Sequence, residues 1–143
     1  MTSLDIHSQK ILILDFGSQY TQLIARRIRE IGVYSLVKPY NISISEIIRL
    51  TPKGIIFSGG PNSVNTRKML KPNKKIFSLG IPILGICYGM QLIAREFGGK
   101  VVKSLKKEFG HSTFKINKKS QLFDGCNKDN THDVWMSHAD KVE

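Results

Sequence analysis

A cysteine framed by two glycines is the feature of this sequence best suited to covalent chemistry. The run Gly85-Ile86-Cys87-Tyr88-Gly89 follows the apolar segment Ile81–Leu84 and precedes a helical pattern. This spacing is typical of a nucleophile elbow, a sharp strand-to-helix turn that excludes side chains at the glycine positions. At the start of the helix, unpaired N–H groups favour the thiolate of Cys87, and the N–H of Tyr88 can hold a negatively charged carbonyl oxygen. The predicted chemistry is acyl transfer through a thioester.

The alternative role for Cys87 is structural, because a cysteine in an apolar stretch is often a small buried hydrophobe. A packed core cysteine needs no tight turn, so the flanking glycines favour the nucleophile. Cys126 lies in the polar turn Asp124–Lys128, and we assign it no role. Two cysteines in such different surroundings argue against a disulfide framework and indicate a reducing compartment.

Four short apolar runs indicate the strands of a buried parallel sheet. They occupy Lys10–Asp15, Val33–Val37, Gly54–Ser58 and Ile83–Ile86. Their alternation with helical segments predicts an α/β fold, an open and mostly parallel sheet with helices on both faces. Ligands of such folds bind at the carboxyl ends of the strands, where we expect Gly17, Gly60 and Cys87 to lie.

Helical patterns separate these strands. The helix expected from Tyr20 to Ile31 has one apolar face, formed by Leu23, Ile24, Ile28 and Ile31. The run Ser43-Ile44-Ser45-Glu46 is a capping-box pattern that predicts a short helix ending near Leu50. The stretch Arg67–Leu79 is predicted to be helical, with an interruption at Pro72.

The pattern changes after Gly98-Gly99, where short strands are predicted on either side of a polar connection, Asn117–Asn130. The predicted strands are Val101–Val102, His111–Ile116 and His132–Met136. They indicate an antiparallel extension rather than a second domain. A length of 143 residues fits one domain, and we expect residues 1–9 to be an N-terminal extension of it.

The net charge of +11 raises the question of a nucleic-acid partner. The basic residues are scattered lysines in Arg67–Lys75 and Lys100–Lys119, without the pattern of interleaved aromatic residues that base stacking needs. We therefore expect a solvated basic surface and no nucleic-acid partner, while an acidic partner surface stays open. No apolar stretch is long enough for a membrane span, and the first residues lack a signal-peptide core, so we expect a cytoplasmic protein without a membrane partner.

Four segments together resemble the class I glutamine amidotransferase family and, within it, the amidotransferase domain of GMP synthetases. The likeness runs from about Lys10 to the end of the chain, and it implies a flavodoxin-like fold. The segments that carry it are Asp15–Gln22, Ser58–Pro61, Gly85–Gln91 and Asp133–His138.

In that family a cysteine attacks the side-chain amide of glutamine, releases ammonia and leaves a glutamyl thioester that water hydrolyses to glutamate. The resemblance implies that Cys87 is the catalytic nucleophile and that the N–H groups of Gly60 and Tyr88 form the oxyanion hole. It also implies glutamine-binding roles for Gln91 and for a later segment, Ser137, His138, Ala139 and Asp140. Ala139 stands where the family usually has glycine, and we expect its methyl group either to strain the substrate contact or to narrow the glutamine pocket.

The family's general base is a histidine in a His-x-Glu triplet, and these 143 residues contain no such triplet. His138 is the alternative base, but it lies in the substrate-contact segment and would have to rotate toward Cys87. The resemblance therefore implies part of a longer protein, an amidotransferase domain truncated before its base, which by itself hydrolyses glutamine poorly or not at all.

The resemblance places ATP and Mg²⁺ in an ATP-pyrophosphatase synthetase domain that is absent here. That domain, in cis or in trans, would use the ammonia to convert XMP to GMP in purine biosynthesis, and it would carry any homodimer contact. We expect no metal and no cofactor in this chain. Two alternatives stay open: the amidotransferase of another synthase, such as anthranilate synthase, and a non-catalytic, basic flavodoxin-like binding module. The second leaves the cysteine elbow unexplained.

Overall fold

The structure is a computed structural model that describes residues 5, 7–126 and 131–143; the side chains of residues 106–108 and 137–139 also lie outside the description. The chain divides into two compact units. The first comprises Met1–Val102 with Val142–Glu143, and the second comprises Lys103–Lys141. Each unit is described by itself.

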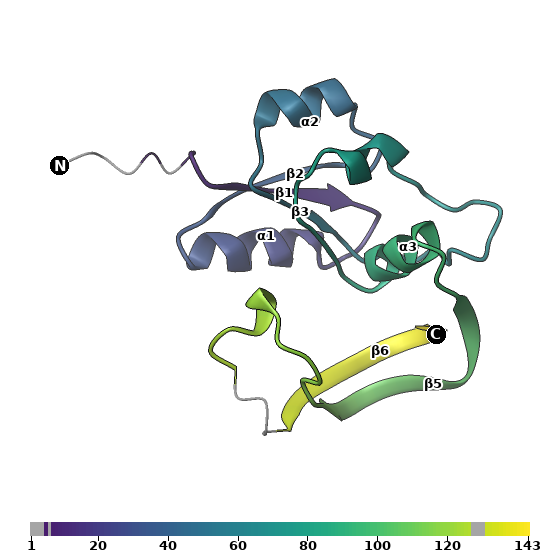
Figure 1. The fold of residues 1–143 in the computed structure, drawn as a ribbon. Coiled ribbons are helices and arrows are strands. Elements are labelled where there is room, and N and C mark those ends of the chain that lie inside the picture. The colour runs from purple at the N-terminus through teal and green to yellow at the C-terminus, as the bar shows by residue number, and fades with distance from the viewer. Residues whose placement is uncertain (1–4, 6, 127–130) are drawn as a thin grey trace. The chain divides into compact units, whose positions relative to one another are not determined.

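A parallel sheet organises the first unit (Figure 1). Its strands stand in the order β2-β1-β3-β4 and every pair is parallel. Their bounds are Lys10–Asp15 for β1, Tyr34–Pro39 for β2, Gly54–Phe57 for β3 and Ile83–Gly85 for β4. The predicted open parallel sheet is confirmed, and the carboxyl ends of all four strands therefore lie at one edge.

Helices α1 (Thr21–Glu30) and α2 (Ile44–Leu50) lie on opposite sides of this sheet (Figure 1). The predicted start of α2 is confirmed, because the Ser43 hydroxyl accepts a hydrogen bond from the N–H of Glu46 over 3.2 Å.

The apolar face predicted for α1 is partly wrong. The side chains of α1 that are buried or half-buried follow helical spacing at Thr21, Ile24, Ala25 and Ile28. Leu23 is 45% exposed and Ile31, just beyond the helix, is 77% exposed. The buried face of α1 is therefore formed in part by the short side chains of Thr21 and Ala25, while the bulkier Leu23 lies on the exposed side of the helix.

The core lies on the face of the sheet that receives Leu12 and Leu14 of β1 with Ile55 and Phe57 of β3. Three helical elements each add a buried side chain to the same cluster. These side chains are Ile47 from α2, Ile76 from the 3₁₀ helix η1 (Lys74–Ser78) and Leu92 from α3 (Tyr88–Glu96). Each such side chain contributes roughly 1.5–3 kcal/mol of transfer free energy, so this cluster holds the strand ends in place.

The helix predicted over Arg67–Leu79 is wrong for most of its length, since only η1 is helical and it is a 3₁₀ helix. Side chains of α3 bind the backbone of the segment between β3 and η1. The hydroxyl of Tyr88 donates to the Leu70 carbonyl over 2.7 Å, and the guanidinium of Arg95 donates to the Val64 carbonyl. These carbonyl groups are paired without forming helical hydrogen bonds.

Two strands, β5 (Val101–Phe114) and β6 (His132–Val142), form a second sheet that lies mostly in the second unit. Lys100 and Glu143, at its base, exchange both backbone hydrogen bonds, at 3.5 and 2.9 Å, which is the antiparallel pattern. Antiparallel strands are confirmed, but their bounds differ from the prediction. The segments predicted as separate strands, Val101–Val102 and His111–Ile116, belong to the single strand β5, which ends at Phe114, and β6 is longer than the predicted His132–Met136. The polar connection contains a short 3₁₀ helix, η2 (Gln121–Phe123).

Among the described residues, no helix combines the length and the apolar character needed to cross a membrane.

Candidate active site

Cys87 occupies the turn between β4 and α3, as predicted. Its backbone has φ 51° and ψ −112°, a strained conformation for a residue with a side chain. The residue is exposed, so its sulfur is not part of the core. The flanking glycines are required by packing: a Cβ on Gly85 would lie 2.6 Å from the Met90 nitrogen, and one on Gly89 would lie 2.5 Å from the Phe57 Cβ.

The loop that follows β3 lies against this turn. A Cβ placed on Gly59 would be 3.4 Å from the Cβ of Cys87, and one placed on Gly60 would overlap the carbonyl oxygen of Phe16. In the loop after β1, a Cβ on Gly17 would be 3.3 Å from the Pro61 ring. The three loops expected at the carboxyl edge of the sheet therefore meet there.

Two serines at this edge escaped the sequence analysis. Ser58 is completely buried; its Oγ accepts from the Phe16 N–H over 3.0 Å and donates to the Gly59 carbonyl over 2.9 Å. The Oγ of Ser18 would lie 3.7 Å from a Cβ on Gly59, beside Cys87. The sequence did contain a signal for Ser58 as a site residue. It is a polar residue directly after a buried strand, and two glycines follow it.

Tyr88 anchors the elbow through its side chain. The ring is 2% exposed, and its centroid lies 5.6 Å from that of Phe16. Burial raises the pKa of the Tyr88 phenol above its ordinary value, because the charged phenolate is poorly solvated there. The backbone N–H of Tyr88 is the first of α3, so no acceptor within the helix is available to it.

Gln91 lies one helical turn beyond the nucleophile position. Its N–H donates to the Cys87 carbonyl over 3.1 Å, and the residue is 8% exposed. A mostly buried amide side chain at this place is compatible with the glutamine-binding role expected for Gln91, which stays a prediction.

The later glutamine-binding segment lies in β6. The side chains of Ser137, His138 and Ala139 fall outside the described residues. Asp140 is half-buried and belongs to the second unit. The contribution of these four residues to a glutamine pocket stays a prediction.

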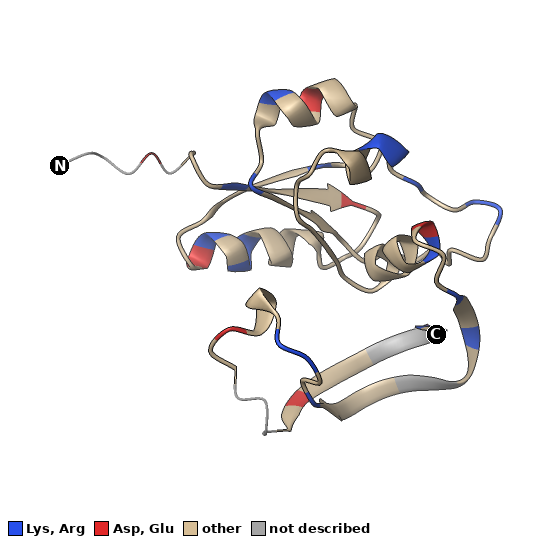
Figure 2. Ribbon diagram, viewed as in Figure 1, with Lys and Arg blue, Asp and Glu red and all other residues tan. Residues whose placement is uncertain are grey.

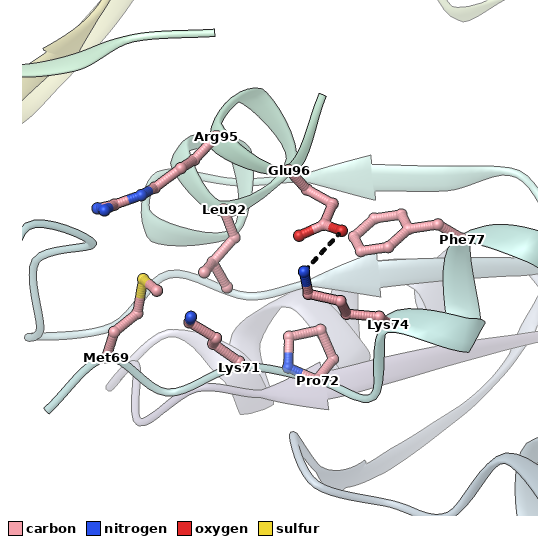
Figure 3. Close-up of a pocket in the computed structure, with 8 residues that line it drawn as sticks. All are labelled: Met69, Lys71, Pro72, Lys74, Phe77, Leu92, Arg95 and Glu96. Atoms are coloured by element: carbon pink, nitrogen blue, oxygen red, sulfur yellow. Dashed lines mark ion pairs between the residues drawn. The ribbon is translucent and has the colours of Figure 1, made fainter. Parts of the chain in front are cut away.

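A hollow of about 260 Å³ is lined by residues of α3, of η1 and of the segment before η1 (Figure 3). Lys74 and Glu96 form an ion pair of 3.7 Å across it. None of the predicted site residues lines this hollow, so it is no candidate for the glutamine site. The lining residues are Met69, Lys71, Pro72, Lys74, Phe77, Leu92, Arg95 and Glu96.

Charged residues of both signs are distributed over α1, α2 and α3 (Figure 2). Glu30 pairs with Arg26 and Arg27, and Glu46 pairs with Lys38 and Arg49. Within the described part of the chain, no cluster of three or more His, Cys, Asp or Glu side chains could hold a metal ion.

The comparisons with known proteins agree on one family. The family described as glutamine amidotransferase class-I matches residues 12–143. A GMP synthase [glutamine-hydrolyzing] of Aquifex aeolicus is 54% identical over 132 residues, which are 92% of this chain and 26% of that protein. The chain thus spans about a quarter of the length of this curated relative.

Solved structures agree on the fold. A protein of Thermoplasma acidophilum, described as a GMP synthase subunit, superposes with a TM-score of 0.77 at 34% identity, covering 94% of this chain and 66% of that one. A glutamine amidotransferase of Thermotoga maritima has a TM-score of 0.67 at 16% identity, covering 94% of this chain and 62% of that one, and this likeness concerns the fold alone. The fold is therefore the flavodoxin-like α/β fold of these amidotransferases. With the family match over residues 12–143, the chain belongs to the class I glutamine amidotransferases.

Proposed function

We propose that this chain is the glutamine-hydrolysing part of a GMP synthetase. The observation that carries the proposal is the exposed Cys87 at φ 51° in the turn between β4 and α3, with the Gly59-Gly60 loop against it. An exposed thiol on a strained strand-to-helix turn fits acyl transfer. A buried structural cysteine would need none of these features.

The proposed reaction begins when the Cys87 thiolate attacks the side-chain amide carbon of glutamine. A carbon–sulfur bond forms, and the carbonyl oxygen becomes negatively charged. The N–H groups of Gly60 and Tyr88 hold that oxygen. The carbon–nitrogen bond then breaks, and the nitrogen takes a proton and leaves as ammonia. Water attacks the resulting thioester, which gives glutamate and restores the thiol.

Glutamine recognition is assigned to Gln91 and to the segment Ser137, His138, Ala139 and Asp140. The near-burial of Gln91 supports its part, because a held amide can bind the amino-acid end of a substrate with little loss of conformational entropy. The methyl group of Ala139 is expected to weaken glutamine binding.

The ammonia would serve an ATP- and Mg²⁺-dependent synthetase domain, in cis or in trans, that aminates XMP to GMP. The relatives described as GMP synthases support this assignment over an amidotransferase of another synthase. We further propose that residues 1–143 form one partial amidotransferase domain with residues 1–9 as an extension, located in the cytoplasm, and that any homodimer forms through the synthetase domain.

Because these 143 residues contain no His-x-Glu triplet, we expect slow glutamine hydrolysis, or none, from them alone. The test is glutamate release from glutamine by the chain and by its Cys87→Ser and Cys126→Ser variants. Any release is predicted to be slow, to be abolished by Cys87→Ser and to be unchanged by Cys126→Ser. Release that survives Cys87→Ser would refute it, and fast release that depends on His138 would refute the expectation about the base.

A further inference from the structure

Ser58 lies between the loops that flank Cys87, directly after β3. Its backbone N–H donates to the Leu14 carbonyl over 3.1 Å and so extends the hydrogen bonding between β1 and β3 by one residue. The residue is 0% exposed, so water does not compete for its hydroxyl. The position of the Ser58 side chain is therefore fixed by the sheet itself.

The Ser58 hydroxyl uses its donor and one of its acceptor sites on loop backbone. Oγ accepts from the Phe16 N–H over 3.0 Å and donates to the Gly59 carbonyl over 2.9 Å. The first bond holds the loop after β1, and the second holds the loop after β3. An alanine at this position would leave both backbone groups without this partner.

The direction of the Gly59 carbonyl determines the direction of the Gly60 N–H. The two groups belong to one trans peptide, which is planar, so they point in opposite directions. The Gly59 oxygen points at the buried Ser58 hydroxyl, and the Gly60 N–H therefore points away from it. With glycine on both sides, no Cβ restricts the rotation of this peptide.

We propose that Ser58 is a positioning residue of the oxyanion hole. Its hydroxyl holds the Gly59–Gly60 peptide in the orientation that presents the Gly60 N–H to the reacting carbonyl oxygen. This inference rests on the proposed glutaminase function. Ser58 touches no substrate and acts through Gly60. A donor held in advance is effective because it does not have to reorient while the charge forms.

Two reagents separate this role from general support of the fold. With the chloromethyl ketone analogue of glutamine, the Cys87 sulfur adds to the ketone carbon and a negatively charged oxygen forms. The sulfur then displaces chloride from the methylene carbon, while its bond to the former ketone carbon breaks and the carbonyl group re-forms. Iodoacetamide loses iodide at a saturated carbon, and no such oxygen forms. The ratio of the two second-order rate constants reports on the oxyanion hole.

Ser58→Ala is expected to lower this ratio about 10-fold or more, with the iodoacetamide rate nearly unchanged. Ser58→Thr keeps the hydroxyl and should keep the ratio. Ser35→Ala is the matched control, because the Ser35 hydroxyl is also buried and donates to a backbone carbonyl, that of Ala25, over 3.0 Å. All rates are measured at temperatures where circular dichroism shows folded protein.

An unchanged ratio in Ser58→Ala would overturn the positioning role, provided that the wild-type chain reacts with the ketone in a glutamine-protected manner. A wild-type chain that shows no such protected reaction would instead refute the proposed function, and the positioning role with it. If Ser58→Ala does not fold, Ser58→Thr decides: a retained ratio supports the role, and a lost ratio overturns it.

Discussion

Gly59 approaches Cys87 so closely that a Cβ on the glycine would lie 3.4 Å from the Cβ of the cysteine. This is ordinary van der Waals contact, and the backbone of Gly59 is outside the left-handed region. Space for a methyl group therefore exists, but that space adjoins the side chain of Cys87 at its Cβ. The absence of a side chain at position 59 serves access to Cys87 more than it serves the fold.

Gly59→Ala should accordingly separate reactivity from stability. We expect the free energy of unfolding to change by less than about 1.5 kcal/mol, because the added methyl group meets no backbone atom closer than 3.9 Å. The rate of Cys87 modification by the chloromethyl ketone should fall about 10-fold or more, since small displacements of a reacting group are costly. Urea unfolding and intact-mass kinetics measure the two effects. An unaltered modification rate would contradict the assigned role of this contact.

Gly89→Ala should destabilise the protein, although alanine is the better helix former. In an exposed helix the change would stabilise by about 1 kcal/mol. Here the new Cβ would lie 2.5 Å from both the Cβ and the carbonyl oxygen of Phe57, so we expect a loss of roughly 1–3 kcal/mol in the free energy of unfolding. Met90→Ala, at a position 46% exposed on the same helix, is the control and should have a smaller effect. A more stable Gly89→Ala protein would show that α3 does not pack on β3 in this way.

Tyr88→Phe removes the hydroxyl that binds the Leu70 carbonyl over 2.7 Å. We expect the free energy of unfolding at pH 7 to fall by about 1 kcal/mol, the usual net contribution of one such hydrogen bond. Tyr20→Phe, at a position 59% exposed, is the matched control and should be nearly neutral. Denaturant unfolding of both variants provides the comparison, and equal stabilities would contradict an anchoring role for the Tyr88 hydroxyl.

The same pair of proteins should respond differently to alkaline pH. Burial raises the folded-state pKa of Tyr88 above its ordinary value of 10.0, so the unfolded chain loses this proton first. The contribution of Tyr88 to stability is therefore complete below pH 10 and is lost as pH rises through the folded-state pKa. The stability difference between wild type and Tyr88→Phe should therefore shrink above pH 10, because only the wild type carries this phenol. The other tyrosines and the lysines titrate in both proteins, so their effects cancel in the difference. A difference that grows in this range would contradict the direction of the pKa shift.

Local sequence was sufficient for the elements that depend on local chemistry. The apolar run at β1 and the serine cap of α2 predicted their elements within a residue or two. The glycines around Cys87 predicted its exposed position, because that turn has few alternative sequences.

Features that depend on contacts between residues far apart in the chain could not be predicted from local sequence patterns. The segment before η1 looked helical, but the Tyr88 hydroxyl of α3 pairs with its Leu70 carbonyl group. Ser58 looked like an ordinary strand end, because its partners Phe16 and Gly59 are brought together only by the pairing of β1 with β3. The strands β5 and β6 were predicted too short, since backbone pairing continues through polar residues that show no apolar alternation.

The central claim, that Cys87 accepts the glutamyl group, is tested most directly by competition between the two cysteines of the chain. Both Cys87 and Cys126 are free and exposed, so exposure alone favours neither. The chain is treated with a limiting amount of the chloromethyl ketone analogue of glutamine, and peptide mapping by mass spectrometry locates the modification. The account predicts modification at Cys87, with glutamine protecting it and Cys126 left largely unmodified. Equal modification of both cysteines, without protection by glutamine, would contradict it.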